Sequence, residues 1–407
     1  EVQQVVYPQT VMKLDIPYLD LRQEQQPAEK LKELINKELQ TPFHLSQGPL
    51  LRAGLYQVEE EKWVFYYAMH HIVSDGWSMG ILIRELLLLY EAHIRGAQPS
   101  LAPLKIHYKD YAAWQQDRLQ ENQLLSGKTY WLKQMEGELP ELNLPVNTPR
   151  PKKTYQVRTI NKIMDADRSY RLKSLCRGQG GTLFMGLLAT VNLLLNRYTK
   201  QQDIIIGSPI AGREHPDLED QIGFYLNTLA LRTRFAEEDS FLTLFNKVKE
   251  VTLGAYEHQN YPFDELVDAL NLQKPAGRNF LFDVWLVLHN AGIDNDADQR
   301  QINKLKISKY EFEGDLPGKF DLLFSFIEIR EELHVSIEYN TGIFNKKEAE
   351  ELADQMDGIL NYIMDEPETT IAGINQKLDK IKEEKRSEYL QAVRKRNSIN
   401  LKKGSQQ

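Results

Sequence analysis

The sequence predicts an α/β protein with layered helices and strands, folded as two lobes. Apolar runs with helical and strand periods alternate along the 407 residues, without an internal repeat or a low-complexity block. A punctuated stretch, 140–151, is rich in proline, and a new series of strand, helix and strand begins after it. The length suffices for two cores, because domains usually hold about 100 to 200 residues. We therefore expect an N-terminal lobe over 1–115, a C-terminal lobe over 116–385 and a basic linker tail over 386–407.

In the first lobe, the period of the apolar residues predicts each element in turn. The start, 2–14, alternates and is expected to lie inside a sheet, whereas 28–39 has helical spacing. The run 50–58 predicts a strand. The next run, 63–69, is apolar on both faces, which predicts a strand in the middle of a covered sheet. Ser78 is expected to cap the helix that follows.

The second lobe shows the same alternation after the proline-rich stretch. Its pattern predicts strands at 159–163, 203–206 and 282–288, and helices at 182–198 and 263–270. Strands that alternate with helices in this way favour a sheet with helices packed against it.

Charge and composition exclude several classes of protein. The chain has 50 Lys and Arg against 58 Asp and Glu, a net charge of −8, which disfavours a general nucleic-acid binder. The single cysteine, Cys176, excludes a disulfide scaffold and is expected to be a buried small hydrophobe. No stretch approaches the roughly 20 apolar residues of a membrane span, and the start does not resemble a signal peptide. We expect a cytoplasmic protein.

The most informative stretch is 69–78, Met-His-His-Ile-Val-Ser-Asp-Gly-Trp-Ser. His70 and His71 stand at the end of a predicted buried strand, where alternation lets only one of them point into a given cavity. Asp75 can make an ion pair, and Gly76 allows close approach of the backbone to a substrate. These residue types suit acyl transfer by a fixed histidine. A core histidine beside a helix cap is the non-functional alternative.

Two other chemistries compete for the same residues. Two histidines and a carboxylate resemble a metal site, but adjacent histidines on a strand face opposite ways, so we assign no metal ligand. The segment 76–80 also matches G-x-S-x-G, the nucleophile elbow of serine hydrolases, with Ser78 as the nucleophile. In an elbow the serine follows its strand almost at once, whereas here 72–76 intervene.

Several motifs together resemble one family. The segment 70–76 resembles HHxxxDG, 108–114 resembles YxDYAxW, 222–228 resembles IGxFVNT, and 258–264 resembles HQDYPFE. In this order they are similar to the motifs of nonribosomal peptide synthetase condensation domains. The resemblance extends from residue 1 to about residue 370.

The resemblance implies two chloramphenicol-acetyltransferase-like lobes that form a V with a tunnel between them. The first two motifs of the family, S-x-A-Q-x-R and R-H-E-x-L-R, are absent from this sequence. We therefore expect the chain to lack the N-terminal segment of the family fold.

The resemblance also implies an activity. Condensation domains join a carrier-bound donor aminoacyl or peptidyl thioester to the α-amine of a carrier-bound acceptor, and the sequence around the motif looks most like the type that joins an L-donor to an L-acceptor. Formation of an ester, or recruitment of partner proteins without catalysis, remain alternatives. The family has no cofactor of its own, because substrates arrive on the 4'-phosphopantetheine of donor and acceptor peptidyl carrier domains. An adjacent adenylation domain is the other expected partner, without nucleic acid or membrane, and the chain is expected to be a monomeric domain of a multidomain synthetase.

Roles for individual residues follow from the same resemblance. His71 would be catalytic, either as a base or by positioning the attacking amine. Gly76 would present its backbone N–H to the developing oxyanion, where a side chain would obstruct approach. The remaining implied roles are a structural one at the active site for His70, Asp75 and Arg213, with Asp75 paired to Arg213, and a substrate-positioning one for Trp77, Ser78 and Asn290.

Overall fold

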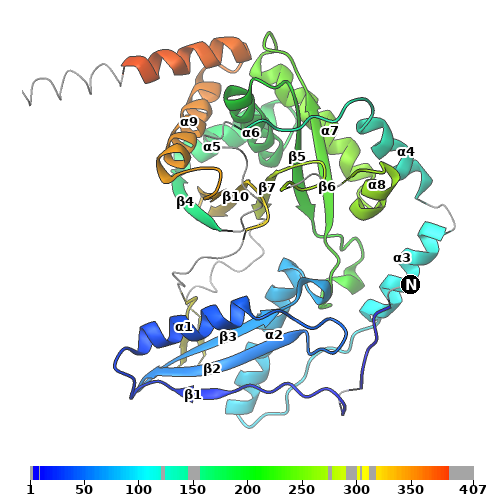
Figure 1. The fold of residues 1–407 in the computed structure, drawn as a ribbon, viewed down its shortest axis with the longest axis vertical. Coiled ribbons are helices and arrows are strands. Elements are labelled where there is room, and N and C mark those ends of the chain that lie inside the picture. Colours follow the sequence, from blue (N-terminus) through cyan, green and yellow to red (C-terminus); the bar gives the residue numbers. More distant parts are fainter. Residues whose placement is uncertain are drawn as a thin grey trace, which may run out of the picture. The chain divides into compact units, whose positions relative to one another are not determined.

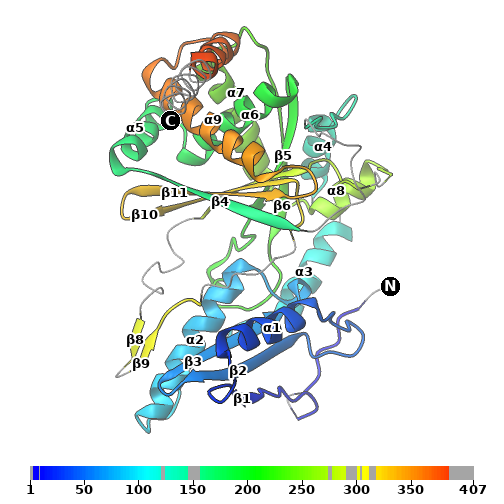
Figure 2. The same ribbon diagram turned by 60° about the vertical axis from the view of Figure 1, so that its left-hand side comes forward.

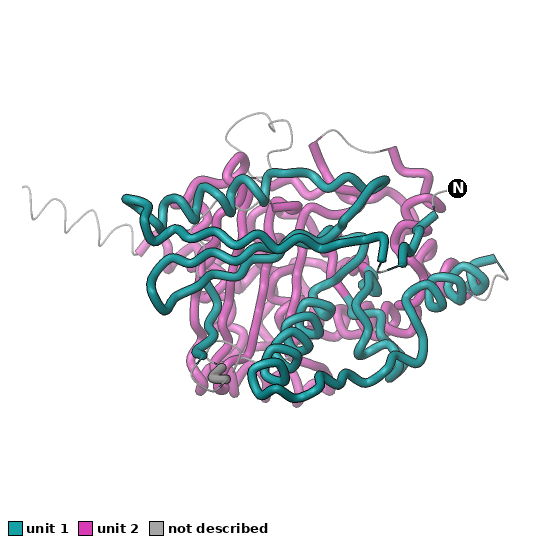
Figure 3. The backbone as a smooth tube through the Cα atoms, turned by 90° about the horizontal axis from the view of Figure 1, so that it is seen from below, with its two compact units in different colours: residues 1–124, 210–227, 291–315 teal, residues 125–209, 228–290, 316–407 magenta. Residues whose placement is uncertain are grey.

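The computed structural model has a mixed α/β fold that divides into two compact units. Unit 1 comprises residues 1–124, 210–227 and 291–315, and unit 2 comprises residues 125–209, 228–290 and 316–407 (Figure 3). The structure describes residues 3–8, 10–120, 124–144, 156–273, 277–289, 300–302, 305–310 and 318–384. The predicted α/β class is confirmed.

The units are not the two contiguous lobes of the sequence prediction. The predicted division between residues 115 and 116 falls inside α3 (Tyr108–Gln120). The segment 210–227, which lies far along the chain, belongs to unit 1. The tail 386–407 lies outside the described residues.

Unit 1 contains a three-stranded sheet in the order β1-β2-β3 (Figure 1). Its strands are β1 (Tyr18–Asp20), β2 (Leu51–Glu59) and β3 (Lys62–Met69). The pair β1–β2 is parallel, and the pair β2–β3 is antiparallel. Helix α1 (Pro27–Gln40) packs on one face of this sheet because its apolar stripe meets apolar strand residues. The core so formed contains Leu21, Leu31, Ile35, Tyr56 and Val64.

Two predictions about the sheet of unit 1 are wrong. β3 was expected in the middle of a covered sheet, but within the described residues it is the last strand of its sheet, with Trp63 and Phe65 exposed by 44 % and 42 %. Only the face of β3 that carries Val64 packs with the α1 core. Apolar residues on both faces of the strand therefore did not indicate that both faces are buried. The chain start is not in the sheet either, since Val5 and Val6 are exposed by 65 % and 73 % and form no strand.

The chain turns after β3 through the short 3₁₀ helix η1 (His71–Val73) into α2 (Gly76–Ile94). The residue that caps α2 is Asp75, which corrects the expected cap at Ser78. Asp75 Oδ1 accepts the backbone N–H of Ser78 at 2.8 Å. The described parts of 291–315 include the antiparallel pair β8 (Arg300–Ile302) and β9 (Leu305–Ile307).

Unit 2 is built on a larger mixed sheet. Its strands follow the order β4-β11-β10-β7-β5-β6, with antiparallel pairing of β11 to β4 and β10 and parallel pairing of β7 to β10 and β5. Alternating burial along β10 and β11 shows that one face of the sheet is covered. The strands are β4 (Val157–Met164), β5 (Asp203–Ile210), β6 (Asn227–Arg234), β7 (Val284–His289), β10 (Leu322–Ile329) and β11 (Glu332–Asn340).

Helices cover that face, with α6 at the centre (Figure 2). Residues 185–196 of α6 are buried without interruption, so this helix is the middle of the unit 2 core. Cys176 is 1 % exposed, as its expected role as a buried small hydrophobe requires. The helices of unit 2 are α4 (Leu125–Gln134), α5 (Ala166–Gly178), α6 (Leu183–Thr199), α7 (Phe241–Glu257), α8 (Phe263–Ala269) and α9 (Lys346–Asp365).

In the part of the chain that the structure describes, no single helix has both the length and the apolarity of a membrane span. Helices α5 and α6 reach these values only when taken together, and they are bent by 99° relative to one another.

Candidate active site

The two adjacent histidines directly follow the end of β3, as predicted, but they are not part of the strand, so strand alternation does not separate their side chains. His70 is the cap of η1, and its Nδ1 accepts the backbone N–H of Ile72 at 3.1 Å. His71 is the first residue of η1. The two side chains are therefore separated by a backbone turn instead of by strand alternation, and only His70 is used as a cap.

The imidazole of His71 is held in one tautomer. Its Nδ1 lies 2.6 Å from the carbonyl oxygen of Ser74. Because a carbonyl oxygen can only accept, we assign the proton to Nδ1, which leaves the lone pair of the neutral ring on Nε2. His71 is exposed, and its ring meets that of Phe224 nearly at right angles, with centroids 5.2 Å apart. The side chain can thus accept a hydrogen bond from a bound group.

Asp75 and Arg213 form a buried ion pair of 3.2 Å, with side chains exposed by only 2 % and 1 %. Asp75 Oδ1 also accepts the backbone N–H and the hydroxyl of Ser78, at 2.8 and 2.7 Å. Its Oδ2 accepts the backbone N–H of Tyr225 at 3.1 Å. Both oxygens of Asp75 are thus engaged by donors of the chain itself.

Arg213 shapes the loop that precedes β6. Its Nη1 donates to the carbonyl oxygens of Leu218 and Gln221, and its guanidinium lies over the ring of Tyr225, 4.1 Å from the centroid. Gly212 has a φ of +63°, and a Cβ there would lie 2.0 Å from the carbonyl oxygen of Tyr225. The loop therefore closes tightly on itself, and both glycine and arginine are needed for its shape.

Ser78 is fully buried, and its hydroxyl is engaged within the protein. The oxygen lies within donating distance of Asp75 Oδ1 at 2.7 Å and the Gly223 carbonyl at 2.9 Å. It accepts the Gly223 backbone N–H and Arg213 Nη2, both at 3.1 Å. A hydroxyl in these surroundings has no path to an acyl group, which disfavours the serine-hydrolase alternative. It also leaves Ser78 without a surface for positioning a substrate.

Trp77 and Gly76 are both exposed at the start of α2. The indole N–H of Trp77 donates to the carbonyl oxygen of Glu219 at 2.8 Å, which ties the helix to the 213–225 loop. A Cβ built on Gly76 would meet no atom of the chain within 4 Å, so packing does not require glycine there. The first N–H groups of a helix have no partner inside the helix and attract negative charge. The space beside the first turn of α2 is therefore open at Gly76.

The motif around 222–228 supplies contacts that sequence reasoning missed. Phe224 lies against His71, and the backbone of Gly223 and Tyr225 binds Ser78 and Asp75. The resemblance of this segment to IGxFVNT was the available signal, but a motif does not specify which residues it touches.

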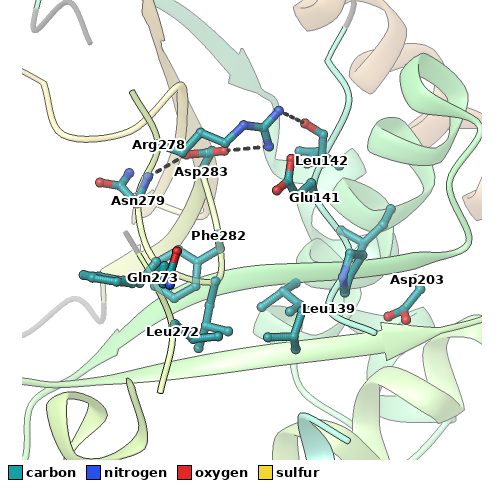
Figure 4. A pocket seen from close by; sticks show the side chains of 15 residues that line it. Leu139, Glu141, Leu142, Asp203, Leu272, Gln273, Arg278, Asn279, Phe282 and Asp283 are labelled. Carbon is teal, nitrogen blue, oxygen red and sulfur yellow. Dashed lines mark hydrogen bonds and ion pairs between the residues drawn. The ribbon is translucent and has the colours of Figure 1, made fainter. Parts of the chain in front are cut away.

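Asn290, predicted to position substrate, lies outside the described residues. Among those that the structure describes, no three His, Cys, Asp or Glu side chains are grouped so that they could hold a metal ion. A pocket of about 180 Å³ lies in unit 2, with an Arg278–Asp283 ion pair of 3.3 Å in its wall (Figure 4). It contains none of the predicted site residues.

Comparison with known proteins identifies the class of protein to which this fold belongs. The family pattern described as condensation domain matches residues 1–384. The chain belongs to the condensation domain family.

Its relatives are large peptide synthetases. The chain is 37 % identical over 361 residues to bacitracin synthase 1 of Bacillus licheniformis, covering 88 % of this chain and 6 % of that protein. It is 39 % identical over 334 residues to tyrocidine synthase 3 of Brevibacillus parabrevis, covering 82 % of this chain and 5 % of that protein. The chain therefore spans less than a tenth of the length of either relative.

Solved structures share the fold. The X-domain from teicoplanin biosynthesis matches with a TM-score of 0.79 and 24 % identity, over 89 % of this chain and 80 % of that one. A four-domain nonribosomal peptide synthetase bound to AMP and glycine matches with a TM-score of 0.77 and 22 % identity, over 89 % of this chain and 28 % of that one. The first condensation domain of the CDA synthetase matches with a TM-score of 0.69 and 19 % identity, over 88 % of this chain and 77 % of that one.

Proposed function

We propose that this chain forms a peptide bond between two carrier-bound thioesters, with an L-donor and an L-acceptor. The observation that supports the proposal most directly is the geometry of His71, whose Nδ1 is bound to the Ser74 carbonyl and whose ring is exposed. This arrangement leaves Nε2 able to accept a hydrogen bond from an attacking amine. The substrates would be presented on the phosphopantetheine arms of donor and acceptor carrier domains, beside an adenylation domain in the same synthetase.

In the proposed reaction, the acceptor α-amine attacks the carbonyl carbon of the donor thioester. A C–N bond forms, the C–S bond breaks, and the donor carrier keeps its phosphopantetheine thiol. The amine loses one proton, and the departing thiolate takes one up. His71 Nε2 would orient the amine and accept its proton or hydrogen bond.

The negative charge that develops on the carbonyl oxygen would be stabilised at the start of α2. Gly76 would contribute a backbone N–H there, and the open space beside it, where a Cβ would meet no atom within 4 Å, would admit the acyl group. Asp75 and Arg213 would act by holding the helix start and the 213–225 loop in place, and His70 by capping η1. Trp77 and Asn290 remain proposed substrate-positioning residues, whereas the buried Ser78 would act through Asp75 and Gly223.

Mass spectrometry of a reconstituted reaction tests this function. The purified chain is mixed with a donor carrier and an acceptor carrier, each loaded with an L-aminoacyl group. The expected product is a dipeptidyl thioester on the acceptor carrier. His71→Ala should lower its rate by about 100-fold or more, in the range of a lost acid–base group. The matched control is His93→Ala near the end of α2, which should leave the rate unchanged. Equal rates for the two variants would contradict the assignment of His71.

The same assay decides on the nucleophile. With a hydroxyacyl group on the acceptor carrier, ester formation would shift the product mass differently from amide formation. A preference for the hydroxyl would replace the peptide-bond assignment with the related ester-forming one.

A second candidate function is recruitment of a partner protein without catalysis. It is favoured by the likeness to the teicoplanin X-domain, which has been solved in a complex with OxyB and matches this chain with a TM-score of 0.78. A chain that forms no product from any loaded carrier pair, but that binds a protein partner in titrations, would support this alternative.

A further inference from the structure

Hydrogen bonds hold the backbone of Phe224 and its two neighbours in place, although Phe224 is exposed. The N–H and carbonyl of Gly223 both meet the Ser78 hydroxyl, at 3.1 and 2.9 Å. On the other side, the N–H of Tyr225 binds Asp75 at 3.1 Å, and the Phe224 carbonyl accepts the Tyr108 hydroxyl at 3.0 Å. The main chain around Phe224 is thus bonded at three successive residues.

The side chain of Phe224 contributes little to any core. It is 38 % exposed, whereas the neighbouring Tyr225 is 3 % exposed and packs with Tyr108 and Tyr111. A rigid backbone therefore presents an exposed aromatic ring, and burial of apolar surface does not account for it. What the ring does touch is His71, at a centroid distance of 5.2 Å and an interplanar angle of 88°.

His71 needs a second restraint. Its hydrogen bond to Ser74 fixes one atom of the ring, Nδ1, but a single bond leaves the imidazole free to tilt about it. Nε2 lies on the far side of the ring, so a small tilt displaces it. An edge-to-face contact between aromatic rings has a preferred angle and opposes such a tilt.

We propose that Phe224 is a positioning residue that sets the orientation of His71 and so aims Nε2 at the acceptor amine. This inference rests on the proposed function for the reaction, but the ring orientation itself can be measured without it. Phe224 acts through His71, and no contact of Phe224 with substrate is required.

Steady-state kinetics with Phe224→Ala, Phe224→Tyr and Phe65→Ala test the proposal. Phe224→Ala should lower kcat roughly three- to tenfold with KM unchanged, which corresponds to loss of one aromatic pair. Phe224→Tyr keeps the ring and should restore kcat. Phe65, a phenylalanine of similar exposure on β3, is the control, and its alanine variant should keep kcat. An unchanged kcat in Phe224→Ala, or a rise in KM alone, would overturn the proposal.

Nitrogen-15 NMR of the His71 imidazole gives a readout that does not depend on turnover. In the unmodified chain we expect one protonated nitrogen, Nδ1, and one unprotonated nitrogen, Nε2. Phe224→Ala should broaden both signals, because the ring tilts more freely about its bond to the Ser74 carbonyl. If the chain forms no product but the signals broaden, the proposed peptide-bond formation is contradicted and the positioning role of Phe224 is supported. Signals that are identical in both proteins would overturn the positioning role.

Discussion

Helices α2 and α6 are both rich in leucine, yet they are held in opposite ways. In α6, residues 185–196 are all buried, so packing on every side fixes the helix. In α2 only Ser78 and Ile81 are buried, and Leu86 and Leu88 are exposed by 42 % and 51 %. What fixes α2 is the polar network at its first turn. The contrast teaches that apolar packing holds the core of unit 2 in position, whereas the buried Asp75–Arg213 ion pair holds the candidate active site of unit 1.

Arg213→Ala should give the largest effect, because it leaves the buried Asp75 carboxylate without its counter-ion. We expect a loss of about 3 to 5 kcal/mol in the free energy of unfolding of unit 1. Arg84→Ala is the matched control. Arg84 joins the same helix to the same loop through Asp220, but both side chains are exposed, by 49 % and 67 %, so its loss should be under about 1 kcal/mol.

Hydrogen exchange followed by mass spectrometry locates this effect. Protection should fall in the first turn of α2 and in 213–225 for Arg213→Ala, and stay unchanged in α6. Equal losses from the two arginine variants would show that burial of the pair does not matter, and the comparison between the helices would fail.

Leu193→Ala in α6 tests the other half of the comparison. The side chain is fully buried, so its truncation should cost about 3 kcal/mol through lost contacts and a cavity. Leu88→Ala in α2 removes the same atoms from an exposed position and should cost under about 0.5 kcal/mol. Urea unfolding monitored by circular dichroism measures both. A similar cost for the two would mean that α2 is packed as α6 is.

Gly76→Ala separates stability from function. No atom of the chain lies within 4 Å of the added methyl group, so the free energy of unfolding should change by under about 0.5 kcal/mol. Condensation should nevertheless fall, because the methyl group occupies the space proposed for the acyl group. Full activity in a stable Gly76→Ala protein would remove Gly76 from the proposed oxyanion site.

Cys176 offers the mildest test, which begins with the unmodified protein. Burial raises the pKa of its thiol to about 12, so the thiolate is absent at pH 8 and iodoacetamide should not label the folded protein. The raised pKa also adds stability that is complete below pH 9 and is lost as the pH rises from 9 towards 12. In Arg213→Ala the thiol should stay unreactive, because the variant acts on unit 1. Rapid labelling there would show that the two cores open together.

Local patterns in the sequence predicted where the helices and strands lie. They predicted less well what packs against each helix or strand. The helix at 182–198 and the strand at 159–163 were found because periodicity is a property of neighbouring residues. The same periodicity placed 63–69 in a covered sheet, since it cannot report what lies above a strand. The cap of α2 was placed at Ser78 because a serine suits a cap as well as Asp75 does.

In the candidate site too, residues within one segment were predicted, whereas contacts between distant segments were not predicted from their own residues. The histidine motif is contiguous and was found from its residues. The Asp75–Arg213 ion pair is present in the structure, but only the family resemblance could suggest it. The contact of Phe224 with His71 was not predicted, because an edge-to-face ring pair leaves no trace in the spacing of either segment.

The distance along the chain between Asp75 and Arg213 affects how the protein is made. The two residues are 138 positions apart. At about 5 to 20 residues per second, a ribosome completes Arg213 roughly 7 to 30 s after Asp75. During that time the Asp75 carboxylate at the first turn of α2 has no Arg213 side chain to pair with. A fragment that ends at residue 124 would carry the histidine motif and would never acquire the partner that holds it in place.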